Sequence, residues 1–193
     1  MKTTIRLATI LFLFTTILFD GCKKGENDPF LSLKSRKARV AGEWKLTSGT
    51  ITFSSSGFSG TATLDGVNLT ADGFSTPYTV AFELDKDGTF KRTTTDDGDI
   101  EIETGTWDFN SGVGEAKKKE LLVLTTLTDT YDGDTETYSG SDAPIETFVL
   151  DELRSKKMVV TMDGSYNDGT DTETTTGSFT FEKHLNPVDW QRI

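Results

Sequence analysis

The chain has 193 residues, 31 of them acidic and 20 basic, with a formal net charge of −11 and a single cysteine, Cys22. This acidic balance repels phosphate backbones and argues against nucleic-acid binding. A lone cysteine excludes an intramolecular disulfide.

The first 21 residues have the three zones of a secretory signal peptide. Lys2 and Arg6 form a short positive region, residues 7–19 are almost wholly apolar, and Gly21 closes the segment. The apolar stretch is shorter than the roughly 20 residues that a membrane-spanning helix needs. We therefore expect residues 1–21 to be an export signal. Its removal would leave 18 basic and 30 acidic residues, a net charge of −12.

Residues 22–32 are polar and predict a tether, which places the folded body at 33–193. Residues 31–41 mix basic and apolar side chains, and Ser32 or Ser35 could cap a short helix there. The basic side chains of this helix could contact a membrane surface. Packing of the helix on one end of the body is the favoured interpretation.

From residue 42 onward the composition is typical of β-strands. Residues 78–84 alternate apolar and polar side chains, which predicts a strand with one buried face. Asp132-Gly133 and Asp168-Gly169 indicate tight hairpin turns. Further strands are expected at 89–95, 100–109, 121–131, 145–153, 157–166 and 174–184. The segment 54–77 is either one long loop or holds an extra strand near 60–64.

Short strands with no long crossovers predict an all-β, antiparallel meander. We expect it to close into a barrel of about eight strands, because closure removes unpaired edges. A two-sheet β-sandwich is the alternative. A barrel of this size can hold one small ligand.

Acidic residues concentrate in alternate turns of the expected meander. Turns at 96–99, 129–142 and 163–173 should share one end, because every second connection lies at the same end. The other turns carry basic residues, namely Lys86, Lys117, Lys118, Lys119, Arg154, Lys156 and Lys157. Residues 132–136 offer oxygen ligands of the kind that calcium prefers. Asp and Gly are also ordinary turn residues, so no metal site is predicted.

The sequence offers no convincing catalytic set. His184 is the sole histidine, so neither a Cys–His pair nor a usual zinc ligand set is present. No glycine-rich phosphate loop precedes a helix. We therefore expect a protein that is not an enzyme and uses no cofactor. Seven aromatic residues could line a pocket or a sugar-binding surface, although core packing is favoured: Phe53, Phe58, Phe74, Tyr78, Tyr131, Tyr138 and Tyr166.

The segment Phe19-Asp20-Gly21-Cys22 resembles the lipobox of bacterial lipoproteins. The resemblance implies cleavage between Gly21 and Cys22, a diacylglyceryl group on the Cys22 sulfur and an amide-linked acyl chain such as palmitate. Several acyl chains together give stable membrane anchoring. The expected location is the cell envelope, at the outer membrane, with the periplasmic and surface faces both open.

Gly42-Glu43-Trp44 follows the short basic segment and resembles the Gly-x-Trp signature of lipocalins. With Gly105-Thr106-Trp107, it is similar to the lipocalin-like lipoproteins of the Bacteroidetes over residues 33–183. The resemblance implies that Gly42 lets the chain pass closely and that Trp44 plugs one barrel end. It also implies a late basic residue over Trp44, either Arg192 or Lys183.

The resemblance and the expected barrel together predict a lipid-anchored binding protein for a small apolar or amphipathic molecule. The alternative is an envelope interaction or structural protein with a filled barrel that contacts another protein or a glycan. A cavity of about 300 Å³ or more, lined by aromatic side chains, would favour the first function. A packed interior would favour the second.

Overall fold

The computed structural model describes residues 35–55, 57–111, 120–167 and 172–184. The predicted export signal (1–21), the lipidation site at Gly21 and Cys22, the tether (22–32) and Arg192 lie outside the described residues. No helix in the described part is long and apolar enough to cross a membrane.

One sheet of eleven strands makes up nearly all of the described chain. Its elements are α2 (Arg36–Val40), β1 (Gly42–Ser55), β2 (Phe58–Leu64), β3 (Asn68–Ala71), β4 (Phe74–Leu84), β5 (Thr89–Asp96), β6 (Asp99–Ser111), β7 (Glu120–Tyr131), β8 (Asp134–Thr137), the short 3₁₀ helix η2 (Gly140–Asp142), β9 (Ile145–Leu153), β10 (Lys157–Asn167) and β11 (Thr172–Lys183).

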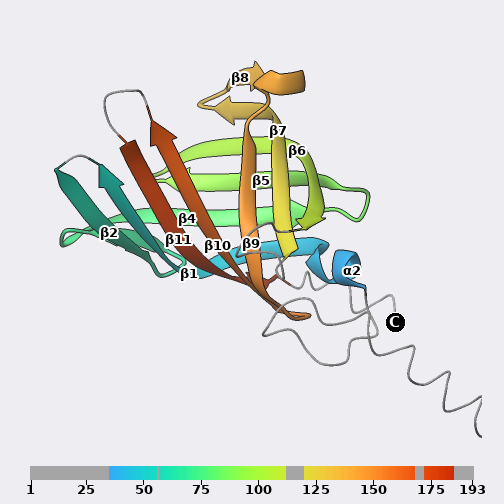
Figure 1. Ribbon diagram of the computed structural model, residues 1–193, viewed down its shortest axis with the longest axis horizontal. Coiled ribbons are helices and arrows are strands. Elements are labelled where there is room, and N and C mark those ends of the chain that lie inside the picture. The colour runs from blue at the N-terminus through green and yellow to red at the C-terminus, as the bar shows by residue number, and fades with distance from the viewer. Residues whose placement is uncertain (1–34, 56, 112–119, 168–171, 185–193) are drawn as a thin grey trace, which may run out of the picture.

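The sheet closes on itself as an antiparallel barrel (Figure 1). Around the ring the strands follow the order β1, β4, β5, β6, β7, β9, β10 and β11, and β11 pairs back with β1. The predicted barrel of about eight strands is therefore confirmed, and the β-sandwich alternative is wrong.

The barrel is wider at one end than at the other. Residues 42–45 of β1 pair directly with β4, whereas residues 49–55 pair with β2. The hairpin β2–β3 is thus inserted between β1 and β4 at the wide end, which raises the strand number there to ten. The segment 54–77, which the sequence left open, contains two strands. β8 pairs with the last residues of β7 and extends beyond the ring.

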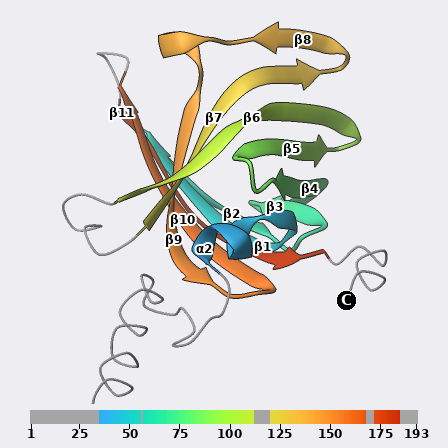
Figure 2. The ribbon, with the colours of Figure 1, turned by 90° about the vertical axis from the view of Figure 1, so that its right-hand side faces the viewer.

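Helix α2 lies against the narrow end of the barrel (Figure 2). The Ser35 hydroxyl oxygen accepts a hydrogen bond from the Ala38 backbone N–H at 3.2 Å, which confirms Ser35 as the helix cap. Arg36 forms a buried ion pair with Glu120, and Arg39 Nη1 donates to the Leu153 carbonyl oxygen at 2.6 Å. Packing of the helix on the body, the favoured interpretation, is confirmed.

Alternation of side chains gives each strand an inner and an outer face. In β4 the residues Phe82 and Leu84 are buried, while Glu83 between them is exposed. The predicted period of two is therefore confirmed for this strand. Inward residues from all around the ring form one core at the narrow end and the middle of the barrel, with members that include Trp44, Leu84, Trp107, Leu124, Leu150, Leu153 and Met158.

The strand order puts the described acidic turns at the wide end, as predicted. Asp97-Gly98 and Asp132-Gly133 connect β5 to β6 and β7 to β8, with positive φ at both residues of each pair. Positive φ at both central residues is what a type I′ turn requires. The Asp168-Gly169 turn lies outside the described residues.

The predicted basic rim is only partly correct. Lys86 and Arg154 occupy turns at the narrow end, but Asp85 and Asp87 share the turn with Lys86. The narrow rim is therefore mixed in charge, because aspartates also cap its tight turns: Asp87 Oδ1 accepts from the Thr89 N–H at 3.0 Å.

Trp44 closes the narrow end of the barrel. It is fully buried, and its indole Nε1 donates to the Val40 carbonyl oxygen at 2.6 Å. Lys183 Nζ lies 4.9 Å from the centre of the Trp44 ring, as expected for a cation–π contact. The same ammonium group donates to the carbonyl oxygens of Arg39 and Ala41 at 3.0 and 2.5 Å. Of the two predicted basic residues, Lys183 takes this place.

We predict that Gly42→Ala destabilises the protein more than Gly57→Ala. Both glycines have positive φ, +136° and +83°. A Cβ at Gly57 would meet nothing within 4 Å, whereas one at Gly42 would lie 2.3 Å from Lys183 Cε. The expected loss of unfolding free energy is about 1 kcal/mol for Gly57→Ala and roughly 3 kcal/mol for Gly42→Ala, measured by denaturant unfolding.

A double-mutant cycle identifies the cause of the difference. In a Lys183→Ala background the clash is gone, so the cost of Gly42→Ala should fall towards that of Gly57→Ala. An unchanged cost in that background would contradict the assigned contact.

Candidate ligand cavity in the barrel

A cavity of about 240 Å³ lies inside the barrel, between the packed core and the wide end. Its wall is mainly apolar and is contributed by residues of eight strands: Leu46, Ile51, Leu64, Tyr78, Val80, Phe82, Arg92, Thr94, Glu101, Glu146, Phe148, Met162, Phe179 and Phe181. The volume is below the roughly 300 Å³ expected for a small-molecule site, so the cavity suits only a small ligand.

The floor of the cavity is tightly packed. The rings of Phe82 and Phe181 meet edge to face with centroids 5.4 Å apart. Below them, between Leu84, Leu122 and Met158, the remaining hollow is only about 10 Å³. The interior is therefore filled in the narrow half of the barrel and open in the wide half. The cavity is smaller than the roughly 300 Å³ that would favour ligand binding, and the interior is not packed throughout, so neither expected interior is found in full.

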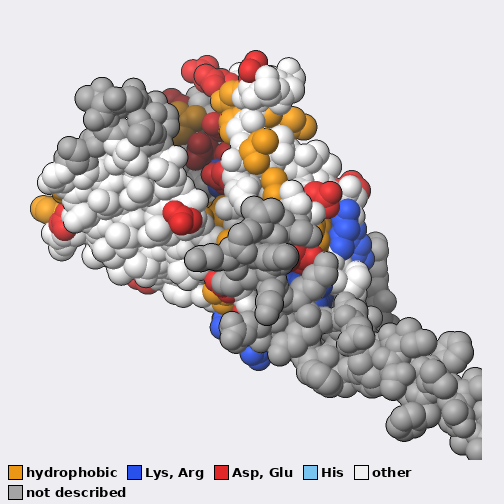
Figure 3. Space-filling view, in the orientation of Figure 1, with side chains coloured by type: hydrophobic (Ala, Val, Ile, Leu, Met, Phe, Trp, Pro, Cys, Tyr) orange, Lys and Arg blue, Asp and Glu red, His pale blue; other side chains and the backbone are white. Residues whose placement is uncertain are grey.

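The cavity is open where two strands separate. β10 pairs with β9 only along residues 158–161, and its remaining residues towards the wide end have no register partner on β9. Acidic side chains gather in the recess between β9 and the β10–β11 pair (Figure 3). A ligand would therefore meet negative charge before it reached the apolar wall.

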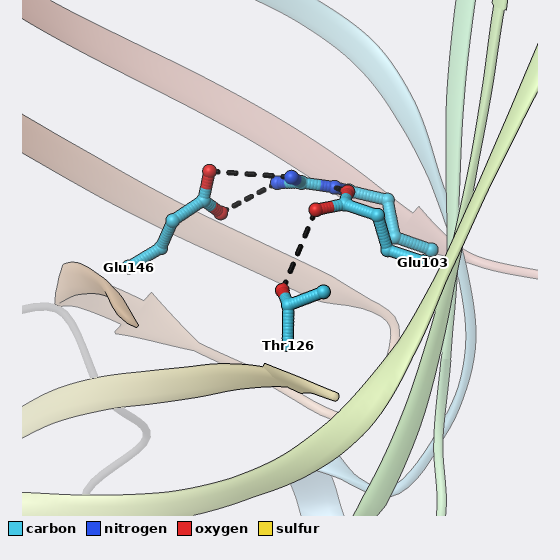
Figure 4. Close-up of polar contacts among 4 residues, drawn as sticks. Glu103, Thr126 and Glu146 are labelled. Carbon is cyan, nitrogen blue, oxygen red and sulfur yellow. Dashed lines mark hydrogen bonds and ion pairs between the residues drawn. The ribbon is translucent and has the colours of Figure 1, made fainter. Parts of the chain in front are cut away.

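Arg92 is the one basic residue that lines the cavity in the part of the chain that the structure describes, and Glu103 and Glu146 bind it (Figure 4). Arg92 Nε donates to Glu103, its partner directly across the β5–β6 ladder. Its Nη1 and Nη2 donate to the two carboxylate oxygens of Glu146 on β9, at 2.5 and 3.2 Å. Glu103 also accepts from Thr126 Oγ1 at 3.4 Å. The network thus joins β5, β6, β7 and β9 inside the barrel.

Glu103 and Glu146 stabilise the charged form of Arg92. Burial lowers the pKa of the guanidinium, but the hydrogen bond with Glu103 and the charge and hydrogen bonds of Glu146 outweigh burial, so the pKa is raised. The Arg92 guanidinium also lies 5.9 Å from the Phe82 ring centre, at the boundary between the polar network and the apolar wall.

A second hollow of about 230 Å³ adjoins the cavity towards the wide end. The two share Tyr78, Thr94 and Glu101 in their walls. Burial, and then the negative charges of Glu103 and Asp129, raise the pKa of the Glu101 carboxyl. Burial followed by Glu103 and Glu136 likewise raises the pKa of Asp129. The carboxylates in this region therefore carry more negative charge than the single positive charge of Arg92 balances.

The alternation of side chains along β6 places two glutamates inside the barrel. Trp107 is buried and points inward, so Glu103 and Glu101, at the same parity, also face the interior. Ile100 faces outward and is 52% exposed. The first part of β6 thus reverses the usual pattern of apolar inside and polar outside. Counting by twos back from Trp107 could have identified both glutamates from the sequence.

A β-bulge in β7 turns a further acidic residue, Asp129, to the same face as Glu103. The β6–β7 register shifts between Thr104 and Gly105, and Leu127 is the extra residue on β7. As a result Asp129 lies opposite Glu103, and Tyr131 lies opposite Glu101. A period of two through β7 would have predicted the opposite face for both, because a bulge reverses the parity of all later residues.

The predicted aromatic core is partly wrong. Phe58, Phe74 and Tyr131 are exposed because they lie on the hairpins that extend past the packed part of the barrel. Tyr78 lines the cavity, and Phe53 stacks on Phe58 with ring centres 5.6 Å apart. These aromatic side chains therefore lie at the wide end of the barrel and are not part of its fully buried core.

The other sequence-selected residues lie away from the cavity. Gly42 and Trp44 belong to the closed narrow end, and the His184 N–H donates to the Glu43 carbonyl oxygen there at 2.8 Å. Within the described ranges, no group of three or more His, Cys, Asp and Glu side chains is arranged to hold a metal ion.

We predict that Arg92→Met costs about 3 kcal/mol of unfolding free energy, because the largely buried Glu103 loses its cation. The neighbouring Lys91→Met is the matched control. Lys91 points outward and pairs at the surface with Glu83, 3.2 Å away, so its loss should cost under about 1 kcal/mol. Equal costs in chemical denaturation would contradict a structural role for the Arg92 network.

The chain matches no protein-family model, no curated protein and no solved structure. Its resemblance to the lipocalin-like lipoproteins therefore stays a prediction, based on residues 42–44 and 105–107 and compatible with the closed barrel.

Proposed function

We propose that the protein is a lipid-anchored envelope protein whose barrel binds a small apolar or amphipathic molecule without transforming it. The observation that carries the proposal is the cavity in the wide half of the barrel, with an apolar wall and a few polar groups at one side. Such a combination is typical of small-molecule sites. The adjoining hollow, which shares walls with the cavity, extends the space for a ligand.

Binding without catalysis fits the polar groups of the cavity. A glycosidase requires two carboxyl groups that face the scissile bond from opposite sides. Here Glu103 and Glu146 bind the same guanidinium, so oxygens of both carboxylates are already engaged by Arg92. We infer that the network orients the polar end of a ligand and fixes the shape of the wall.

Membrane anchoring is proposed from the sequence. Residues 1–21 have the pattern of an export signal, and Gly21-Cys22 fits the lipobox cleavage site. The short basic helix that follows the tether turns Arg36 and Arg39 towards the barrel. We therefore assign anchoring to the acyl chains on Cys22 and not to a basic surface of the helix.

A specific observation favours envelope interaction as a second candidate function. A shallow hollow of about 350 Å³ lies between the turns at Gly98 and Gly133 and is lined in part by Ile100 and Ile102. Ile145 is also exposed, at the start of β9. Apolar groups exposed near the wide end could contact a protein or a glycan while the barrel serves as a scaffold.

We predict that Val80→Phe abolishes ligand binding. Val80 lines the cavity, and a phenylalanine would occupy part of the small volume. Thr79→Phe, at the exposed neighbouring position on β4, is the matched control. Native mass spectrometry of the chain from residue 22 onward, carrying Cys22→Ala and mixed with an envelope lipid extract, should show adducts for the parent and Thr79→Phe only.

Two results would count against cavity binding. Adducts that persist in Val80→Phe would show that molecules attach elsewhere. A complete lack of adducts in the parent, together with capture of an envelope protein by the wide end, would favour the second function.

We predict that Cys22 carries the acyl chains. In a Gram-negative host fed an alkyne-tagged fatty acid, the full-length protein should take up the label and sediment with membranes. Cys22→Ala should lose the label and move to the soluble fraction, whereas Ser32→Ala in the tether should behave like the parent. Label retained in Cys22→Ala would contradict the assignment.

A further inference from the structure

The charge of the cavity wall points to the chemistry of its ligand. Among the described residues, Arg92 is the sole basic one that lines the cavity or the adjoining hollow. Glu103 and Glu146 already neutralise it from two sides. A carboxylate or phosphate on a ligand would have to displace a glutamate from Arg92, and it would approach through further negative charge.

Glu101 is the lining glutamate to which Arg92 does not hydrogen-bond, although the Arg92 charge acts on it from a distance. Among the described residues, the Glu101 carboxylate forms no ion pair or side-chain hydrogen bond, although it lines both the cavity and the adjoining hollow. Across the ladders it lies opposite Thr94 and Tyr131. It is therefore free to accept a charge-assisted hydrogen bond from a ligand.

Two tyrosines and a second carboxylate support a positive group at the same place. Tyr78 and Tyr131 line the adjoining hollow beside Glu101, and aromatic faces attract ammonium groups. Asp129, which lies opposite Glu103, has a buried Oδ1 without a hydrogen-bond partner among the described residues. The local potential at Glu101 is thus negative and incompletely compensated.

The apolar half of the cavity lies on the other side of Glu101. Phe82, Phe148 and Phe181 form its lower wall, and Val80 and Met162 flank it. A ligand that spans both regions needs an apolar body and a positively charged end.

We infer that the barrel binds a small cationic amphiphile, an alkyl or aryl amine, with its apolar part against Phe82, Phe148 and Phe181 and its ammonium group at Glu101. This inference rests on the proposed function, since it names the ligand class of that cavity. The interaction is an ion pair at the partly open end of the cavity, so salt weakens it.

Three linear probes with eight carbon atoms each test the inference: octylammonium, 1-octanol and octanoate. They are titrated by calorimetry at low ionic strength into the chain from residue 22 onward carrying Cys22→Ala, which retains every described element. Octylammonium should bind about tenfold more tightly than octanol, as one charge-assisted hydrogen bond implies. Octanoate should bind more weakly than octanol.

Two variants test whether the preference for octylammonium comes from Glu101. Glu101→Gln should lower the octylammonium affinity about tenfold, to the level of octanol, and leave octanol binding unchanged. Glu83→Gln is the matched control, because it removes the same charge from the exposed face of the neighbouring β4. It should leave all three affinities unchanged.

The outcomes separate the two proposals. If none of the three probes binds, or if Val80→Phe binds them as the parent does, the proposed cavity function fails. If octanol or octanoate binds as tightly as octylammonium, the cavity function stands and the cationic ligand class is overturned. If octylammonium is preferred but Glu101→Gln and Glu83→Gln weaken it equally, the preference reflects overall charge and the assignment to Glu101 is overturned.

Discussion

Backbone pairing along β1 is the constraint on which the rest of the structure depends. One edge of this strand pairs with β11 over nearly its whole length, and the other edge is divided between β4 and β2. Direct pairing with β4 brings the walls together and lets Trp44 and its neighbours fill the narrow half. Insertion of β2–β3 moves the walls apart, and the side chains of the wide half no longer fill the interior.

The spacing of the barrel walls decides where charged side chains can lie in the interior. In the narrow half, aromatic and aliphatic side chains exclude polar groups, apart from those that bind backbone carbonyls or each other, such as Lys183 over Trp44. In the wide half, the space next to the cavity admits Arg92 with Glu103 and Glu146. An ion pair of this kind stabilises the barrel only as a set, because each member left alone would be a buried, uncompensated charge.

Sequence reasoning was most successful for local features. Residues 145–153 were predicted as a strand with the bounds that the structure has, and Phe82 and Leu84 of β4 are buried on the predicted inner face. The Ser35 cap and the Asp132-Gly133 turn also depend on a few adjacent residues. Of the hairpin β2–β3, only a strand near 60–64 was predicted, as an alternative to one long loop. β3 was not predicted, because it has only four residues and gives a weak hydrophobic signal.

The candidate site was far less predictable. Glu103 could have been assigned to the interior by parity with Trp107, but the bulge at Leu127 that brings Asp129 and Tyr131 inward leaves no signal in the residues of β7 alone. Glu146 is 54 positions from Arg92 in the chain. Their contact requires the complete ring, since β5 and β9 are not adjacent strands.

The sequence by itself determined where most of the strands and turns lie and that the acidic turns share one end, because alternation and turn chemistry are properties of neighbouring residues. Only the tertiary structure decided that the barrel is packed in one half and hollow in the other, and that Glu101 faces the hollow without an ion-pair partner among the described residues. These properties follow from strand register and ring closure, which arise from hydrogen bonds between segments distant in the chain.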